Sequence, residues 1–96
     1  MTTYVYPAIL EGDAAGGYSV YFPDLPGCTS AGDTQTEAAL NAADGLAAHI
    51  QLMLEDGEAL PAPTPVETLE GFSDETEAAR FLVTAHVGAN PRVAAE

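Results

Sequence analysis

The clearest structural signal in this chain is the segment Gly17-Tyr-Ser-Val-Tyr-Phe-Pro-Asp-Leu-Pro-Gly-Cys28. Its first half alternates like a half-buried strand, with three apolar residues on one face: Tyr18, Val20 and Phe22. Ser19 and Tyr21 share the other face. Its second half predicts a rigid turn, because Pro26 presets φ and Gly27 supplies the positive φ of a type II turn.

Two further strands flank this segment. Upstream, Tyr4–Leu10 is β-branched and aromatic, and it reads as a strand that a flexible hairpin loop, Glu11–Gly17, joins to the next one. Pro7 lacks a backbone donor, so an edge position or a bulge is expected there. Downstream, Cys28–Ala31 can form a short third strand. Tight connections between three strands indicate an antiparallel meander.

A long amphipathic helix follows the meander. Thr34 and Glu37 fit the capping box, in which the hydroxyl bonds the N3 amide and the Glu reaches back. The predicted apolar stripe contains Ala39, Leu40, Ala43, Leu46, Ala47, Ile50, Met53 and Leu54. Gly45 costs about 1 kcal/mol against Ala inside a helix, which suggests close packing at that point. Gly57 is a natural C′ residue, so the helix should end just before it.

The remainder completes an α+β domain over residues 1–88. Leu60–Thr64 is a proline-rich connector, and Ser73–Ala79 could form a short acidic helix with Ser73 as its cap. Phe81–Val87 alternates and reads as a last strand that can pair with the first. The expected order is therefore β-β-β-α-β, with the helical side on one face of the sheet. Residues 89–96 read as a short tail.

Charge restricts the class of partner. Fifteen Asp and Glu oppose two Arg and no Lys, a formal net charge of −13. Such a chain should repel nucleic acid and anionic membranes and attract a cationic protein. The alternative is that acidity only maintains solubility or reflects a salt-rich habitat. No apolar run approaches the roughly 20 residues that span a bilayer, and no secretory signal is visible, so the cytoplasm is the expected location.

No catalytic, metal or cofactor site is expected. Cys28 is the only cysteine and reads as a small buried thiol, while His49 and His86 lie on different predicted elements. A metal-dependent nuclease would need converging carboxylates, but the helix acids are spread along its solvent side: Glu37, Asp44 and Glu55. The two cations, Arg80 and Arg92, form no patch for nucleic acid.

Several of these segments resemble the HicB antitoxin family. They are Tyr6-Pro-Ala-Ile9, Gly17–Cys28, Gly32-Asp-Thr34 with Glu37-Ala-Ala-Leu-Asn-Ala42, and Glu55-Asp-Gly-Glu-Ala-Leu-Pro61. The most specific is Phe22-Pro-Asp-Leu-Pro-Gly-Cys28. The resemblance implies a partial ribonuclease-H-like fold and a partner, the small basic ribonuclease HicA, which the antitoxin binds and occludes. It does not imply nuclease activity, because Tyr4–Leu10 lacks the acid that ribonuclease H needs in its first strand.

One departure limits what can be carried over. Many members of the family have a C-terminal DNA-binding module, and this sequence stops near where that module would begin. Operator binding is therefore not expected of it. A stand-alone domain that binds another protein or mainly itself is the alternative to toxin neutralisation, and an enzyme is the third.

The expected partner is thus a small basic toxin, with a homodimer or higher homo-oligomer also expected because a small core and free strand edges favour association. Exposed acids and aromatics near the edge of the meander are the candidate contacts. By loop placement and charge they are Glu11, Asp13, Tyr21, Asp24 and Asp33.

Overall fold

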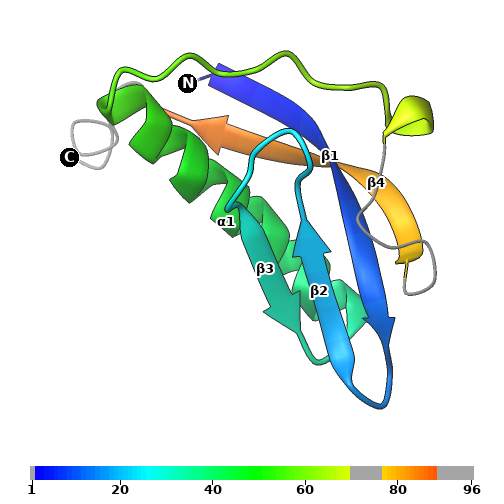
Figure 1. Ribbon diagram of the computed structural model, residues 1–96. Coiled ribbons are helices and arrows are strands. Elements are labelled where there is room, and N and C mark those ends of the chain that lie inside the picture. The colour runs from blue at the N-terminus through cyan, green and yellow to red at the C-terminus, as the bar shows by residue number, and fades with distance from the viewer. Residues whose placement is uncertain (1, 70–76, 89–96) are drawn as a thin grey trace.

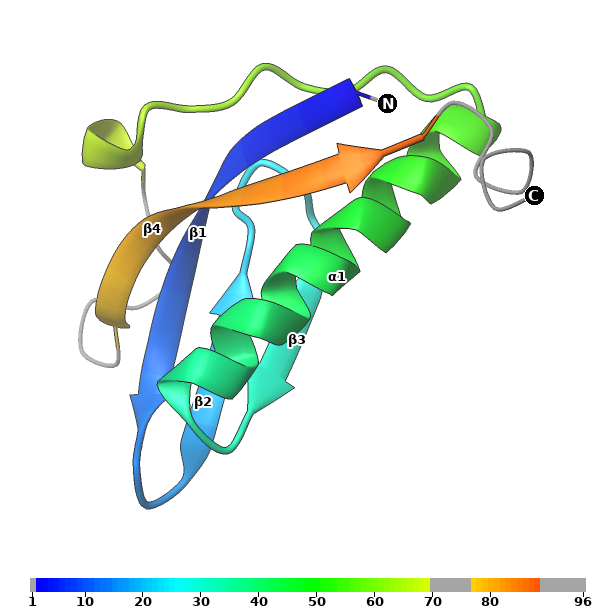
Figure 2. The same ribbon diagram turned by 180° about the vertical axis from the view of Figure 1, so that it is seen from behind.

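The computed structural model describes residues 2–69 and 77–88. The elements are β1 (Thr2–Asp13), β2 (Gly17–Tyr21), β3 (Thr29–Gly32), α1 (Gln35–Glu55), the 3-10 helix η1 (Val66–Thr68) and β4 (Glu77–Val87). All strand pairs are antiparallel, and they form one sheet in the order β3-β2-β1-β4. α1 crosses one face of this sheet (Figures 1 and 2). The predicted β-β-β-α-β order and the α+β class are confirmed.

β1 is the long central strand, and it joins the meander to β4. It pairs with β2 from Ile9 to Asp13 and with β4 from Thr2 to Glu11. Pro7 therefore lies where β1 has a strand partner on one side only, since registered pairing with β2 begins two residues later. A missing N–H disturbs no ladder on the side without a strand partner, which agrees with the edge position expected for this proline.

The hairpin between β1 and β2 is tighter than predicted. The strands extend to Asp13 and start again at Gly17, so most of the expected loop Glu11–Gly17 is strand. The Asp13 Oδ1 atom accepts hydrogen bonds from the backbone N–H of Ala15 at 3.0 Å and of Gly16 at 2.8 Å. The Asp13 side chain thus satisfies two backbone N–H groups of the turn that would otherwise bond to water.

The turn after β2 has the predicted form. The Cys28 N–H donates to the Leu25 carbonyl at 3.0 Å, and Gly27 has φ of 89°. These are the closing hydrogen bond and the positive φ of a type II turn, with Pro26 in the preceding position.

The expected helix over Ser73–Ala79 is wrong in its last three residues. β4 begins at Glu77, which pairs with Glu11, and Ala79 pairs with Leu10. Pairing with the long β1 overrides the local helix propensity of this acidic, alanine-containing stretch. Residues 73–76 of that prediction, and the predicted tail 89–96, lie outside the described residues.

α1 is capped much as predicted. The Glu37 N–H donates to Thr34 Oγ1 at 3.0 Å. The Glu37 carboxylate accepts from the Asp33 N–H at 2.8 Å, one residue earlier than in a standard capping box. One free donor of the first helical turn and the N–H of the residue before the cap are satisfied in this way.

The buried stripe of α1 is rotated from the predicted one. The fully buried residues are Ala38, Ala42, Leu46 and Ile50, at intervals of four. Leu40 and Leu54, which the prediction placed in the core, are 65% and 44% exposed. The two alanines allow α1 to lie very close to β3, and a leucine at either position would hold it away.

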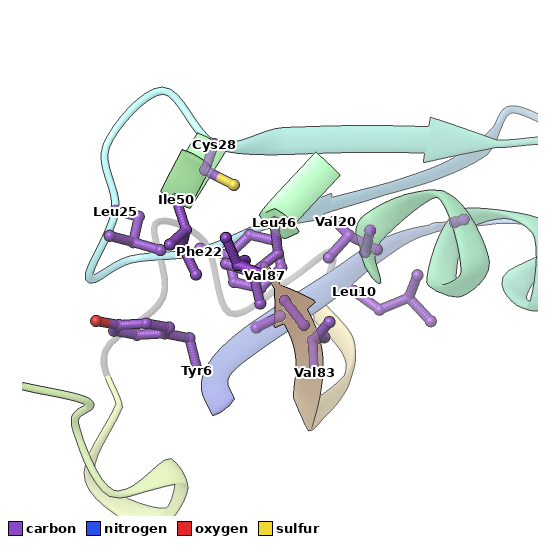
Figure 3. Close-up of a cluster of buried hydrophobic side chains, with 14 residues drawn as sticks. Tyr6, Leu10, Val20, Phe22, Leu25, Cys28, Leu46, Ile50, Val83 and Val87 are labelled. Carbon is purple, nitrogen blue, oxygen red and sulfur yellow. The ribbon is translucent and has the colours of Figure 1, made fainter. Parts of the chain in front are cut away.

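Two apolar clusters occupy the two faces of the sheet. The larger lies between α1 and the sheet and includes Val20, Phe22, Leu46 and Val83 (Figure 3). The smaller lies on the other face, where Leu69 covers Ile9 and Tyr21. No polar or charged side chain is buried in the described part of the chain.

Two glycines at the contact between α1 and β3 give a paired prediction. A Cβ on Gly32 would lie 2.5 Å from the Ala38 nitrogen, whereas a Cβ on Gly45 would meet only the Thr29 carbonyl oxygen at 3.7 Å. The close packing expected at Gly45 is therefore found at Gly32. We expect Gly45→Ala to raise the free energy of unfolding by about 1 kcal/mol through helix propensity. Gly32→Ala should lower it by about 1–3 kcal/mol through overpacking.

Urea denaturation of the two variants beside the wild type measures both effects. Equal changes of the same sign would contradict the described approach of α1 to β3.

Candidate partner-binding surface

Three of the predicted contact acids gather at one end of the sheet. Glu11 and Asp13 are near the β1–β2 turn, and Asp33 follows the last residue of β3. β2 lies between them, because Asp13 pairs with Gly17 and Gly32 pairs with Tyr18. Figure 1 shows the β1–β2 turn and the β3–α1 connection at this same end. We call Glu11, Asp13 and Asp33 the hairpin-end surface.

The hairpin-end surface has a shallow hollow of about 370 Å³, which β2, β3 and Asp33 line together with the hairpin glycines. Asp13 and Asp33 are exposed, and Glu11 is partly exposed. Carboxylates on an open surface can contact lysine and arginine side chains without a large desolvation cost. This geometry suits contact with a cationic protein.

Asp24 lies apart from these acids, on the turn after β2, where it has a structural task. Its carboxylate accepts hydrogen bonds from the Thr64 N–H at 2.8 Å and from the Thr64 hydroxyl at 2.6 Å. The Tyr6 hydroxyl donates to the Pro61 carbonyl at 2.5 Å in the same connector. Burial, and next the nearby Asp24 charge, raise the pKa of Tyr6. Both contacts hold the connector 58–65 against the sheet.

Tyr21 is not the exposed aromatic that was predicted. Its side chain is only 7% exposed. It belongs to the smaller apolar cluster, with Ile9 and Leu69, on the face of the sheet away from α1. The prediction assumed that this face was open to solvent, and the sequence contains no local signal that Leu69 returns to cover it.

A second hollow lies where α1 ends, and sequence reasoning missed it. Its volume is about 500 Å³. Its apolar wall includes Leu25, Leu52 and Met53, and its acids are Asp24, Asp56 and Glu58. His49 also lines it. We call it the helix-end groove. The available signal was the Asp-Gly-Glu sequence directly after the helix, without a basic residue in the last turn.

Positive charge is scarce on the described surface. Arg80 is the only lysine or arginine among residues 2–69 and 77–88, and it is engaged within the chain. Its guanidinium contacts Glu77 at 2.6 Å and donates to the Leu69 carbonyl. The hydrogen bond from Arg80 lowers the pKa of Glu77. The one described cation therefore fastens β4 to the segment that covers Tyr21.

Residues considered for catalysis have structural surroundings. Cys28 is buried as predicted, and burial raises the pKa of its thiol to about 11, so little thiolate forms at neutral pH. The His86 Nδ1 atom shares a 3.1 Å hydrogen bond with the Thr3 hydroxyl across β1 and β4. In the described ranges no three His, Cys, Asp or Glu side chains group so as to hold a metal ion. The absence of an enzymatic role stays a prediction.

Among the described helices, none combines the length and apolar character that crossing a membrane requires.

Comparison with known proteins identifies relatives by sequence. Residues 6–90 match the family described as HicB_like antitoxin of bacterial toxin-antitoxin system. An uncharacterized 14.9 kDa protein of Haemophilus phage HP1 is 45% identical over 80 residues, which are 83% of this chain and 57% of that protein. Antitoxin HicB 1 of Photorhabdus laumondii is 44% identical over 61 residues, 64% of this chain and 39% of that protein. The chain thus spans about half the length of these curated relatives.

Solved structures share the fold. The N-terminal domain of Burkholderia pseudomallei antitoxin HicB matches with a TM-score of 0.65 and 26% identity, covering 88% of this chain and 99% of that one. A chain of the HicA3 and HicB3 toxin-antitoxin complex matches with a TM-score of 0.61 and 26% identity, over the same shares.

Asp24 provides a prediction about the stability of the fold. Asp24→Ala removes both hydrogen bonds to Thr64 and should lower the free energy of unfolding by about 1.5–3 kcal/mol, since bonds to charged groups are strong. Asp33→Ala, the matched control, removes an exposed carboxylate and should change it by less than about 0.5 kcal/mol. Thermal unfolding followed by circular dichroism makes the comparison, and equal destabilisation by both variants would contradict the role assigned to Asp24.

Proposed function

The chain belongs to the HicB-like antitoxin family of bacterial toxin-antitoxin systems, and on this basis we propose that it neutralises a small basic ribonuclease toxin of the HicA type. It does so by binding the toxin and covering the surface on which RNA would bind. The similarity to a chain of the HicA3 and HicB3 toxin-antitoxin complex supports this choice of partner. In this proposal the protein is a non-enzymatic binding module that acts in the cytoplasm, where such a toxin meets RNA.

The main support for the proposal is a large excess of negative charge on the surface of a domain whose core is apolar. The formal net charge is −13, and no charged side chain is buried in the described part. The only lysine or arginine described there is held by Glu77. An RNA-binding surface is cationic, so an acidic protein competes with phosphate for the same groups and is steered toward them.

The hairpin-end surface is the proposed first contact. Glu11, Asp13 and Asp33 lie at one end of the sheet, on a compact edge that the tight hairpin presents. Asp24 contributes at the other end, through the helix-end groove that it lines. Tyr21 is buried and leaves the set of proposed contacts.

Self-association through β4 is the second part of the proposal. β4 stands at the edge of the sheet, and in the described residues no strand pairs with its outer side. Leu82 and Val5 lie on the face away from α1 and are 58% and 37% exposed. A second copy pairing along β4 would satisfy the edge and extend this apolar face. Such pairing also represents the alternative function, a stand-alone domain that mainly binds itself.

Toxin neutralisation is tested with a purified small basic ribonuclease of the HicA type. We expect the purified chain to abolish RNA cleavage by that protein at a stoichiometric ratio. Because the attraction is electrostatic, the affinity measured by calorimetry should fall by about tenfold or more between low and high salt. Undiminished RNA cleavage with the chain in excess would reject toxin neutralisation.

Self-association is tested by introducing a positive charge at the edge of β4. Leu82→Lys places an ammonium beside the proposed pairing edge and should shift the protein to monomer in sedimentation experiments. Leu40→Lys changes a similarly exposed leucine on α1, away from β4. This variant should have the same oligomeric state as the wild type. A wild-type protein that sediments as a monomer at high concentration would refute pairing through β4.

A further inference from the structure

The helix-end groove combines two kinds of wall. The turn after β2, the last turns of α1 and the connector meet there around a space of about 500 Å³. Leu52 lines this space and is 59% exposed, so its side chain is accessible to a partner. The volume is in the usual range of about 300–1,000 Å³ for a site that holds a ligand group rather than a few waters.

The acids of the groove serve no need of the helix. The end of α1 is closed by its own backbone: Gly57, with φ of 76°, donates to the Leu54 carbonyl, and Glu58 donates to the Met53 carbonyl at 2.9 Å. The carboxylates of Asp56 and Glu58 form no hydrogen bond or ion pair in the described part of the chain. Negative charge at the C-terminal end of a helix is unfavourable, because the helix dipole is already negative there.

Position and chemistry together define what would fit. An apolar surface leads to three carboxylates and a helix C-terminal end, while the one described arginine is engaged on the other face of the sheet. A lysine or arginine side chain matches both parts, since its methylene stem packs on apolar surface and its head takes the charge. A neutral group would match only the apolar wall, and a small anionic group would match neither the wall nor the carboxylates.

We infer that the helix-end groove receives a lysine or arginine side chain of the basic partner protein, a contact that rests on the proposed toxin-binding function. Leu52 and Met53 contact its aliphatic stem. Asp56 and Glu58 accept hydrogen bonds from its charged head, and Asp24 lies beside them on the turn. In this role Asp56 and Glu58 serve binding, at a small cost in helix stability.

Two double variants with the same change in net charge isolate the groove. Asp56→Asn with Glu58→Gln removes two carboxylates from it, and Asp44→Asn with Glu67→Gln removes two exposed carboxylates elsewhere. Calorimetric titration with a small basic ribonuclease of the HicA type should show a loss of about tenfold or more in affinity for the first pair. The second pair should lose about threefold or less, because only long-range attraction changes.

Two further readouts separate binding from folding. The groove pair should unfold at the same temperature as the wild type or higher, because an unfavourable charge at the helix end is removed. Leu52→Ser should also weaken binding, and Leu40→Ser, its exposed counterpart on α1, should not.

The outcomes that overturn the inference differ from those that overturn the proposed function. Equal losses for the two pairs would reject the groove while toxin binding stands, since general charge would then explain the affinity. A wild-type chain that does not bind the basic protein would reject both. If the groove pair and Arg92→Gln lowered the unfolding temperature by the same amount, the occupant would be the chain's own arginine, and the proposal would fall.

Discussion

Burial of one narrow stripe of α1 against the sheet is the constraint on which the rest of this structure depends. Ala38 and Ala42 are small enough for the helix to lie against β3, where Gly32 leaves no room for a side chain. Leu46 and Ile50 then pack into the larger apolar cluster with Phe22 and Val83. This core accepts no charged group, and none of the acids among the described residues is buried.

That arrangement makes the surface the functional part of the molecule. Charge of one sign opposes compaction through self-repulsion, so a small domain gains little stability from carrying it. A cationic partner neutralises this self-repulsion when it binds, and the relief of the repulsion strengthens the binding. The hairpin-end surface and the helix-end groove offer two such places, one open and polar, the other hollow and partly apolar. Membership of an antitoxin family gives this chemistry a fitting role.

Local chemistry explains which features could be predicted from the sequence. The type II turn at Gly27, the Thr34 cap, the alternation of β2 and the pairing of the last strand with the first depend on nearby residues or on strict periodicity, and all are confirmed. The rotation of α1 could not be predicted in the same way. Leucines at 40 and 54 satisfy helical spacing as well as alanines at 38 and 42, and only the approach of β3 decides between them.

Tertiary contacts explain what was missed at the candidate site. Tyr21 is buried because Leu69, far along the chain, returns over it, and Arg80 holds that segment in place. The helix-end groove needs three elements that meet only in the folded chain. Charge and loop placement could therefore predict acids as contacts, but not which of them lie together.

The most direct test of the account is a competition between RNA and this chain for a catalytically inactive form of a HicA-type toxin. Fluorescence anisotropy of labelled RNA bound to that toxin follows the exchange. If the chain covers the RNA site, its addition releases the RNA completely, and no complex contains all three molecules. A stable complex of RNA, toxin and chain would contradict the account.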